Sequence, residues 1–395
     1  MRCNVQAVPK EPQNEAPVEY HGITTRELRR AEVVDSPCNR VFFAPQREGY
    51  SVWDLVTGGG GFIGSHLVDR LLQDGRHVRV LDSFVVGSRE NLSQHTANKQ
   101  LEVVQADVAD VGAVTAASEG VERIFHLAAR ADIVPSIQDP EAYFRANVDG
   151  TFAVLTAARR HAVRCLVYTA SSSCYGIPDV HPTPETAPIR PQYPYALTKY
   201  LGEELVLHWA RVYALPAKSV RLFNVYGPRA RTSGTYGAVF GVFLAQLLAG
   251  EPLTIVGDGE QTRDFTFVSD AVEALITVSK SGKAGEIYNV GTSQPASVNE
   301  LVRLLGEPRA VHIPKRPGEP DCTCADIHKI RSQLGWAPKV SFADGVKIMR
   351  ANIEHWRDAP VWTPTRIADA TADWFRFLGT KAEHVGGFDE PRAKS

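Results

Sequence analysis

Short apolar runs alternate with amphipathic stretches between residues 52 and 223 of the chain. Runs of four to six apolar residues bounded by turn residues are typical of buried strands, and a 3.6-residue apolar period is typical of helices that cover a sheet. Strands and helices that alternate in this way form right-handed βαβ units, which predicts an α/β fold with a doubly wound parallel sheet. The expected strands are 52–56, 77–81, 101–104, 123–127, 165–168 and 218–223, and the expected helices are 62–73, 147–160 and 195–213.

The alternation is confined to the middle of the chain. Residues 1–50 are rich in Pro, Glu and Arg without sustained periodicity, which predicts an extension that is partly disordered or lies on the surface. Residues 51–224 carry the predicted sheet. From 225 to 345 the pattern loosens and Gly, Pro and Arg increase, which predicts a smaller C-terminal substrate-binding lobe with segments that return to the sheet. The pattern of residues 346–395 predicts a helical tail whose tryptophans pack against the protein and take no part in catalysis.

A glycine-rich run follows the strand at 52–56 and opens the next helix. Without a Cβ at Gly58, Gly61 and Gly64, the backbone can turn tightly and approach a pyrophosphate at the helix N-terminus. Asp82 closes the next strand, where a carboxylate accepts hydrogen bonds from an adenosine ribose and repels a 2′-phosphate. These features predict a Rossmann-type dinucleotide site that prefers NAD to NADP. Asp107, after the third strand, meets the adenine amine or is a surface turn residue.

A tyrosine and a lysine share one face of a predicted helix, because Tyr195 and Lys199 are four residues apart. A phenol with a pKa of about 10 is a poor base at neutral pH. The Lys199 ammonium and a positive nicotinamide ring favour the phenolate and bring that pKa toward the working range. Ser171, at the end of the preceding strand, can orient the reacting hydroxyl. The three residues predict proton and hydride transfer, with Lys199 also holding the nicotinamide ribose.

Composition narrows the choice of partners. The 395 residues are 44% hydrophobic and 22% charged, as in an ordinary globular protein. A net charge of −2 gives no reason to expect nucleic acid or an anionic membrane. Because no apolar run is long enough to span a bilayer and no signal peptide is recognisable, a cytoplasmic location is expected. Only two of the six cysteines, Cys322 and Cys324, are close together, and their spacing does not predict a metal site.

With these motifs the chain resembles the extended short-chain dehydrogenase/reductase family, and within it the nucleotide-sugar epimerases of the UDP-galactose and UDP-N-acetylglucosamine 4-epimerase type. The resemblance covers about Val52 to Val346. It implies NAD as the cofactor, a UDP-sugar as the substrate, and a homodimer held by the helices that start near Asn147 and Tyr195. The segments that carry it are Thr57–Gly64, His126–Ala129, Asn147–Thr151, Ser171–Gly176, Tyr193–Lys199 and Arg221–Pro228.

The resemblance also implies roles for individual residues. Asn224, Arg263 and Arg316 would contact the diphosphate, for which planar guanidinium groups are well suited. Glu319 would bind the nucleotide ribose, and the backbone from Thr254 to Val256 would hold the uracil. The expected cofactor-binding residues are Gly58, Gly61, Phe62, Ile63, Gly64, Asp82, Ser83, Asp107, Val108, Leu127, Ala128, Ala129, Asn147, Tyr195 and Lys199. The expected substrate-binding residues are Ser171, Ser172, Asn224, Thr254, Val256, Arg263, Arg316 and Glu319.

The same scaffold also carries 4,6-dehydratases and decarboxylases. Dehydratases that resemble this chain have an Asp-Glu pair after the catalytic Thr, and uronate decarboxylases tend to have a Glu in that stretch. Here Ser172 and Ser173 stand there and cannot serve as acids, which favours plain 4-epimerisation through a transient 4-keto intermediate. Decarboxylase or dehydratase chemistry is the alternative. A non-catalytic NAD-sensing protein is a hypothesis of a different class, which the intact set of Ser171, Tyr195 and Lys199 disfavours.

The sugar is not fixed by the sequence. Galactose-type epimerases often have a lysine where this chain has Ala131. Together with Val134–Ile137, that difference is closer to epimerases that accept N-acetylated sugars or uronates. UDP-glucose/galactose, an N-acetylhexosamine and a uronate all remain candidates. Arg130 binds a substrate carboxylate or simply faces solvent.

Overall fold

The computed structural model describes residues 33–34, 41–42, 52–230 and 239–379. The chain divides into two units, residues 1–51 and residues 52–395. In the first unit, strands β1 (Val33–Val34) and β2 (Val41–Phe42) pair antiparallel. The other residues of the predicted N-terminal extension, and the tail beyond Gly379, lie outside the described residues.

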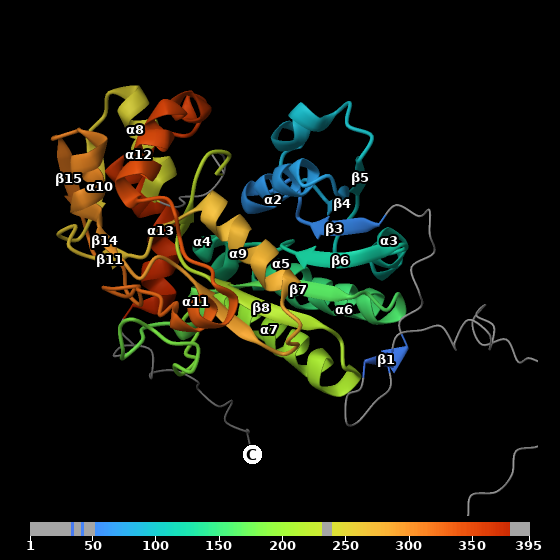
Figure 1. Ribbon diagram of the computed structural model, residues 1–395. Coiled ribbons are helices and arrows are strands. Elements are labelled where there is room, and N and C mark those ends of the chain that lie inside the picture. Colours follow the sequence, from blue (N-terminus) through green and yellow to red (C-terminus); the bar gives the residue numbers. More distant parts are fainter. Residues whose placement is uncertain (1–32, 35–40, 43–51, 231–238, 380–395) are drawn as a thin grey trace, which may run out of the picture. The chain divides into compact units, whose positions relative to one another are not determined.

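Within the described residues, a parallel sheet of seven strands forms the core of the second unit (Figure 1). From β3 the chain builds outward to β4 and β5 on one side, and then to β6, β7, β8 and β13 on the other. A crevice opens at the carboxyl ends of the strands where the order reverses. The predicted Rossmann-type doubly wound sheet is therefore confirmed. In spatial order the strands are β5 (Leu101–Gln105), β4 (His77–Asp82), β3 (Trp53–Thr57), β6 (Val121–His126), β7 (Cys165–Ser171), β8 (Ala217–Leu222) and β13 (Ile287–Val290).

The strands form where apolar residues run continuously, because helices cover both faces of the sheet. Every residue of β8 is buried, and so is every residue of β7 except the last. At the edge, β5 has no fully buried residue. Most observed strand ends lie within two residues of those expected, but β7 continues three residues beyond its expected end, to Ser171. Hydrogen bonding rather than hydrophobicity decides where pairing stops.

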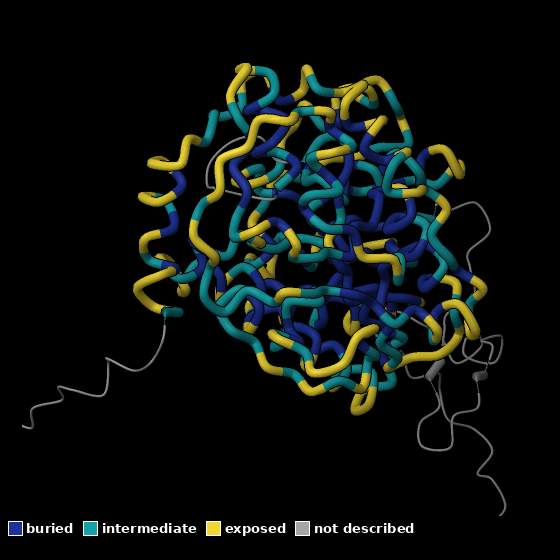
Figure 2. Tube along the Cα trace, turned by 90° about the vertical axis from the view of Figure 1, so that its left-hand side faces the viewer, coloured by how far each residue is buried: buried dark blue, intermediate teal, exposed yellow. Residues whose placement is uncertain are grey.

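Each face of the sheet has its own apolar cluster. One cluster contains Leu71, Leu275 and Ile330, and the other contains Leu155 and Val206. The helices of the first face are α2 (Phe62–Gln73), α9 (Val268–Lys280) and α11 (His328–Leu334), and those of the second are α3 (Val111–Ala117), α6 (Gly150–Arg160) and α7 (Pro194–Tyr213). Figure 2 shows the buried residues gathered in the interior and the exposed ones along the outer turns.

The helix expected over 147–160 begins differently. The short helices α4 (Ile133–Gln138) and α5 (Pro140–Phe144) lead into a π-helical turn at Arg145–Asp149, and α6 follows directly. Asn147 therefore lies inside a π turn instead of starting an α-helix. Such π turns are rare and occur mostly as single turns inside α-helices, so the sequence predicted one continuous α-helix here.

Beyond residue 224, smaller elements surround a third apolar cluster that includes Phe243, Leu253, Met349 and the fully buried Trp356. The chain also returns to the sheet there, because β13 pairs with β8. Where the two lobes divide stays a prediction. The paired strands are β9 (Val225–Tyr226) with β12 (Thr266–Phe267), β10 (Leu253–Val256) with β15 (Ala310–Ile313), and β11 (Thr262–Arg263) with β14 (Ala296–Ser297). The helices are α8 (Val239–Ala249), α10 (Val298–Leu305), α12 (Phe342–Ala351) and α13 (Pro364–Leu378). In the described part of the chain, no helix combines the length and apolar character needed to cross a membrane.

Candidate active site

The glycine-rich loop joins the end of β3 to the start of α2 with no room for side chains. Gly58 has φ +74°, and a Cβ there would lie 2.7 Å from the backbone nitrogen of Ala128. A Cβ on Gly64 would overlap the carbonyl oxygen of Gly58. Among the described residues, no side chain caps α2, whose N-cap is Gly61. The N-terminus of α2 therefore offers its backbone N–H groups at the wall of a cavity, as a pyrophosphate site requires.

Asp82 lies beside this loop at the end of β4 and is only 7% exposed. Its carboxylate accepts hydrogen bonds from the backbone N–H of Gly60 at 2.9 Å and of Phe84 at 2.8 Å. Burial raises the pKa of Asp82, and these two hydrogen bonds oppose the rise. Asp107 makes a local turn contact and pairs with Arg145 at 3.2 Å, but it also lines the cavity, so both interpretations of it stay open.

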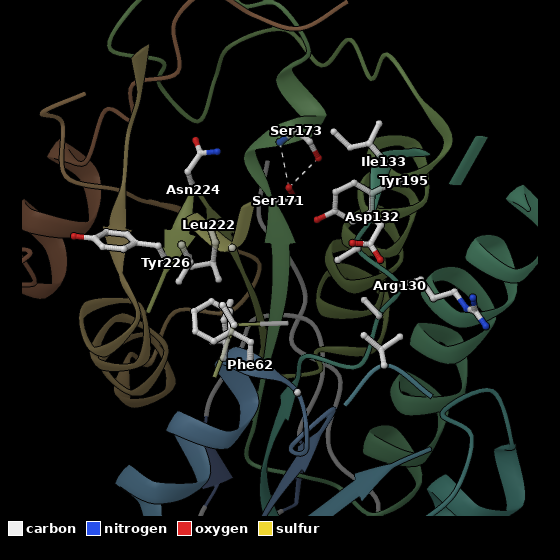
Figure 3. A pocket seen from close by; sticks show the side chains of 18 of the residues that line it. Phe62, Arg130, Asp132, Ile133, Ser171, Ser173, Tyr195, Leu222, Asn224 and Tyr226 are labelled. Atoms are coloured by element: carbon white, nitrogen blue, oxygen red, sulfur yellow. Dashed lines mark hydrogen bonds between the residues drawn. The ribbon is translucent and has the colours of Figure 1, made fainter. Parts of the chain in front are cut away.

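A cavity of about 1070 Å³ brings the predicted site residues together. It extends from the glycine loop, across the carboxyl ends of the strands, to the elements that follow residue 224. Figure 3 shows Tyr195 and Ser171 to the right of Asn224 and Tyr226, with Phe62 of α2 below them. The site residues predicted from the sequence that line this cavity are Gly58, Gly61, Phe62, Ile63, Gly64, Asp82, Ser83, Asp107, Val108, Leu127, Ala128, Ala129, Ser171, Ser172, Tyr195, Lys199, Asn224, Thr254, Val256, Arg263, Arg316 and Glu319.

Asn147 differs from the other predicted cofactor residues because it does not line the cavity. Its side chain is buried and exchanges two hydrogen bonds with the backbone of Arg130, at 2.8 and 3.0 Å, and donates a third to Thr198 Oγ1 at 3.0 Å. These bonds tie the segment after β6 to α7. The structure thus places the Asn147 side chain behind the residues that line the cavity, and its role in cofactor binding stays a prediction.

Ser171 is the last residue of β7, and its hydroxyl faces that of Tyr195 in the first turn of α7 (Figure 3). Ser171 Oγ accepts hydrogen bonds from Ser173, from the hydroxyl at 2.8 Å and from the backbone N–H at 3.2 Å. Burial raises the pKa of Tyr195, hydrogen bonding with Ser171 opposes the rise, and the charge of Asp132 adds to it. Asp132, which lies beside Tyr195 in Figure 3, was missed by the sequence argument.

Lys199 is 4% exposed and lies one turn after Tyr195. Its ammonium nitrogen is 4.4 Å from the centre of the Tyr168 ring. Burial lowers the pKa of Lys199 to about 7, although the charge of Glu203 opposes this. Burial therefore opposes the expected lowering of the Tyr195 pKa, and it also weakens the hold of Lys199 on its proton. That Lys199 and a bound nicotinamide ring together favour the phenolate stays a prediction.

Behind Lys199 lies a buried chain of polar groups that the sequence argument also missed. His126 Nδ1 is 2.7 Å from Thr57 Oγ1, and His126 Nε2 is 3.0 Å from Thr151 Oγ1. Burial, aided by the charge of Lys199, lowers the pKa of His126 to about 3, so the ring is neutral. The chain connects β3, β6 and α6. Only the polarity of His126 and Thr57 at strand ends hinted at it.

Two arginines surround one carboxylate at the other end of the cavity. Arg263 lies 3.0 Å from Glu319, and Arg316 lies 3.9 Å from it. Nearby, the exposed Asn224 accepts a hydrogen bond from Thr323 at 2.9 Å through its side-chain oxygen. The sequence predicted that Arg263, Arg316 and Asn224 would meet a diphosphate, and the structure brings all three to one cavity. A cluster of guanidinium groups at a cavity wall is suited to an anion.

The tail is part of the site as well as of the core. Trp356 packs in the lobe, in line with the expectation that these tryptophans pack, but Trp362 and Trp374 line the cavity. Arg130 also lines the cavity, but its guanidinium is turned away from Tyr195 in Figure 3, so both interpretations of this residue stay open.

Comparison with known proteins agrees with this geometry. A family model described as "NAD dependent epimerase/dehydratase family" matches residues 55–291. The chain belongs to the NAD-dependent epimerase/dehydratase family. The sequence-based assignment to extended short-chain dehydrogenases/reductases is thereby confirmed.

Members of this family with different activities are similar to the chain. The UDP-glucose 4-epimerase of Mycolicibacterium smegmatis is 39% identical over 299 residues, which cover 74% of this chain and 95% of that protein. UDP-glucuronic acid decarboxylase 2 of Arabidopsis thaliana is 38% identical and covers 77% of this chain and 68% of its own length. The structure of UDP-glucuronic acid 4-epimerase from Bacillus cereus, in complex with UDP-glucuronic acid and NAD, is 30% identical with a TM-score of 0.71, over 76% of this chain and 99% of that one.

Proposed function

We propose that the chain is an NAD-dependent UDP-sugar epimerase that inverts C4 through a transient 4-keto intermediate. The observation that carries the proposal is the meeting of Ser171 and Tyr195 in a cavity that the glycine loop also lines. One end of the cavity suits a dinucleotide, the other suits a diphosphate, and the proton-transfer groups lie between.

The residues present fit NAD as the cofactor. Gly58 and Gly64 leave no space for a Cβ, and the N-terminus of α2 has no side-chain cap among the described residues. Asp82 would bind the adenosine ribose, and its carboxylate would repel the 2′-phosphate of NADP. Lys199 would hold the nicotinamide ribose. A cofactor held by these residues would supply hydride transfer at C4 of the sugar, first away from the carbon and then back to its opposite face.

Three side chains would manage the proton of the sugar hydroxyl. Tyr195 takes it as general base and returns it later as general acid. Ser171 orients the hydroxyl, and it is itself fixed by the two hydrogen bonds from Ser173. A phenol whose pKa is raised by burial needs added positive charge before it can act as base. Lys199 supplies such charge when it is protonated.

The nucleotide diphosphate would lie at the arginine end. Arg263 and Arg316 would bind its oxygens, with Asn224 beside them. Glu319, which lies between the two guanidinium groups, would accept hydrogen bonds from the nucleotide ribose. The backbone of Thr254–Val256 in β10 would hold the uracil.

Decarboxylation of a UDP-uronate is the second candidate, because decarboxylases are as similar to this chain as epimerases are. Epimerisation is favoured by the residues after Ser171. Ser173 donates to Ser171 through both its backbone N–H and its hydroxyl; a carboxylate side chain in its place would keep the first hydrogen bond but could not donate the second. Neither Ser172 nor Ser173 can supply the acid expected of a dehydratase or a uronate decarboxylase.

A homodimer is part of the proposal. Helices α6 and α7 lie side by side and expose large apolar side chains. Phe152 of α6 is 47% exposed, and Leu197 and Val212 of α7 are 44% and 46% exposed. An apolar helical face of this kind is suited to a matching face of a second copy, which would form a four-helix interface.

The test is incubation of purified protein with UDP-glucose, UDP-N-acetylglucosamine and UDP-glucuronic acid, with the products identified by NMR. Conversion to the C4 epimer of one of them supports the proposal. A pentose product with loss of the carboxylate would assign decarboxylation instead. No conversion of any of them, with NAD bound, would support a non-catalytic role.

A further inference from the structure

Helix α13 presents one buried face to the rest of the protein. Ile367, Thr371 and Trp374 are 2%, 2% and 3% exposed and follow each other at four- and three-residue spacing. The helix packs against α4, and Gln138 of α4 donates to Asp373 of α13 at 2.9 Å. Because α4 follows the cavity-lining segment after β6, α13 is fixed next to the candidate active site.

Trp374 is the residue of α13 that reaches the cavity. Its indole N–H donates to the carbonyl oxygen of Pro317 at 2.8 Å. The guanidinium carbon of Arg316 lies 5.3 Å from the centre of its ring, a cation–π distance. Its ring also lies 6.3 Å from that of Tyr193, at an angle of 56°.

Tyr193 extends this contact to the proposed base. The rings of Tyr193 and Tyr195 are nearly parallel, at 8°, with centres 6.3 Å apart. Trp374 therefore contacts Arg316 on one side and the Tyr193–Tyr195 stack on the other. One side chain touches both the proposed diphosphate site and the support of the proposed base.

The comparisons indicate that part of this chain is additional to its relatives. The UDP-glucose 4-epimerase and UDP-glucuronic acid 4-epimerase named above are matched over 95% and 99% of their lengths, but only 74% and 76% of this chain is matched. About a quarter of this chain therefore has no counterpart in them. The family model ends at residue 291, before α13 begins.

We propose that Trp374 is a positioning residue that holds Arg316 toward the diphosphate and supports Tyr195 through Tyr193. The proposal rests on the proposed function of this site. Losing the ring would remove the cation–π contact of Trp374 with Arg316 and its ring contact with Tyr193. Loss of a partly desolvated cation–π contact corresponds to roughly five- to thirty-fold weaker binding.

The experiment compares Trp374→Leu, which keeps apolar bulk, with Trp374→Phe, which keeps an aromatic face. Phe377→Ala is the matched control, since Phe377 lies on the same helix and is 59% exposed. Binding of UDP alone is measured by calorimetry, and kcat and KM are measured with the sugar that is turned over. Trp374→Leu is expected to bind UDP about ten-fold more weakly and to lower kcat as well. Trp374→Phe should recover most of the binding, and the control should match wild type.

A double-variant cycle separates positioning from general loss of stability. Arg316→Lys keeps the charge but not the planar group that packs on the ring. If Trp374 acts through Arg316, Arg316→Lys should cost less in UDP binding when Trp374 is already Leu. Fully additive losses in correctly folded variants, as judged by unchanged Tm, would overturn the proposal.

The outcomes also distinguish this proposal from the proposed function. Coupled losses in UDP binding without conversion of any UDP-sugar would support the positioning role and refute epimerisation. Additive losses alongside normal epimerisation would refute only the positioning role. A wild type that binds no UDP would refute both.

Discussion

His126 Nδ1 lies 2.7 Å from the hydroxyl oxygen of Thr57, inside the sheet. The other ring nitrogen meets Thr151, whose own proton is given to the carbonyl oxygen of Asn147 at 2.6 Å. Nε2 must then be the donor to Thr151, and Nδ1 the acceptor from Thr57. A neutral histidine satisfies this arrangement, whereas a second ring proton on Nδ1 would remove the acceptor of the Thr57 hydroxyl proton.

Acid should therefore destabilise the protein through His126. Its pKa falls from the usual 6.5 to about 3 on folding, so between these values only the unfolded chain binds the proton. As the pH is lowered from 6.5 toward 3, protonation of His126 in the unfolded chain alone should reduce the free energy of unfolding by up to about 1.4 kcal/mol per pH unit. Urea unfolding across this pH range measures the slope. His126→Gln should flatten it, whereas His328→Gln, at an exposed position on α11, should not. Equal slopes in all three proteins would contradict the assignment.

Replacement of Tyr195 by Phe tests the proposed base. The change keeps the ring and its stack on Tyr193 but removes the group that takes the sugar proton. Turnover should fall by about 10²- to 10⁴-fold, while Tm and NAD content stay near wild type. Tyr200→Phe on the same helix is the control. Normal turnover by Tyr195→Phe would exclude Tyr195 as the base.

Lys199→Ala tests a second part of the same site. We expect it to lower both turnover and NAD retention, because the proposal gives Lys199 a role in each. Its effect on turnover should depend on pH: the pKa of Lys199 is lowered to about 7, so its charge in the wild type is lost as the pH rises through that value. A pH–rate profile of wild type against variant measures this. Profiles of the same shape would contradict it.

NAD should remain with the protein during purification, because an epimerisation cycle restores NAD and gains nothing by releasing it. Gly64→Ala should lose it, since the added methyl overlaps the Gly58 carbonyl. We expect the free energy of unfolding to fall by about 1–3 kcal/mol. The NAD content of the variant should be at least roughly ten-fold below that of the wild type. Gly282→Ala, in open space, is the control. Absorbance and chromatography of released nucleotide measure the content. A wild type that purifies empty and depends on added NADP would refute the role of Asp82.

A charge on the apolar face of α6 and α7 should separate the proposed dimer. Phe152→Glu places a carboxylate at its centre, and Ile348→Glu makes the same change at a 37% exposed residue of α12. Light scattering at micromolar concentration should report a monomer for the first variant only. A monomeric wild type would overturn the proposed interface.

Local signals in the sequence fixed some elements closely and left others open. Helix α2 has the predicted bounds, because glycines precede it and Gly75 follows it. Ser171, Tyr195 and Lys199 line one cavity, as expected of a residue at the carboxyl end of a parallel strand and of two residues that share a face of the helix after it. Their chemical roles stay predictions until they are tested.

Other features depend on contacts that no local pattern encodes. The π turn around Asn147 is a single irregular turn before α6, and no residue type in the sequence marks it. The weakened basicity of Lys199 comes from burial, which is a property of the assembled structure. Trp374 lies 179 residues after Tyr195 in the chain, and its proximity to the site depends on the packing of α13 on α4.

The pairing of β13 with β8 interlaces the two halves of the protein. A fragment that stopped at residue 224 would keep the glycine loop and Tyr195, but it would expose the backbone of Ser219–Leu222 along an open edge. It would also lose α9, which covers one face of the sheet. The substrate lobe therefore cannot be exchanged between relatives by joining two chains at residue 224. A functional chimera has to keep residues 268–290 with the sheet that they complete.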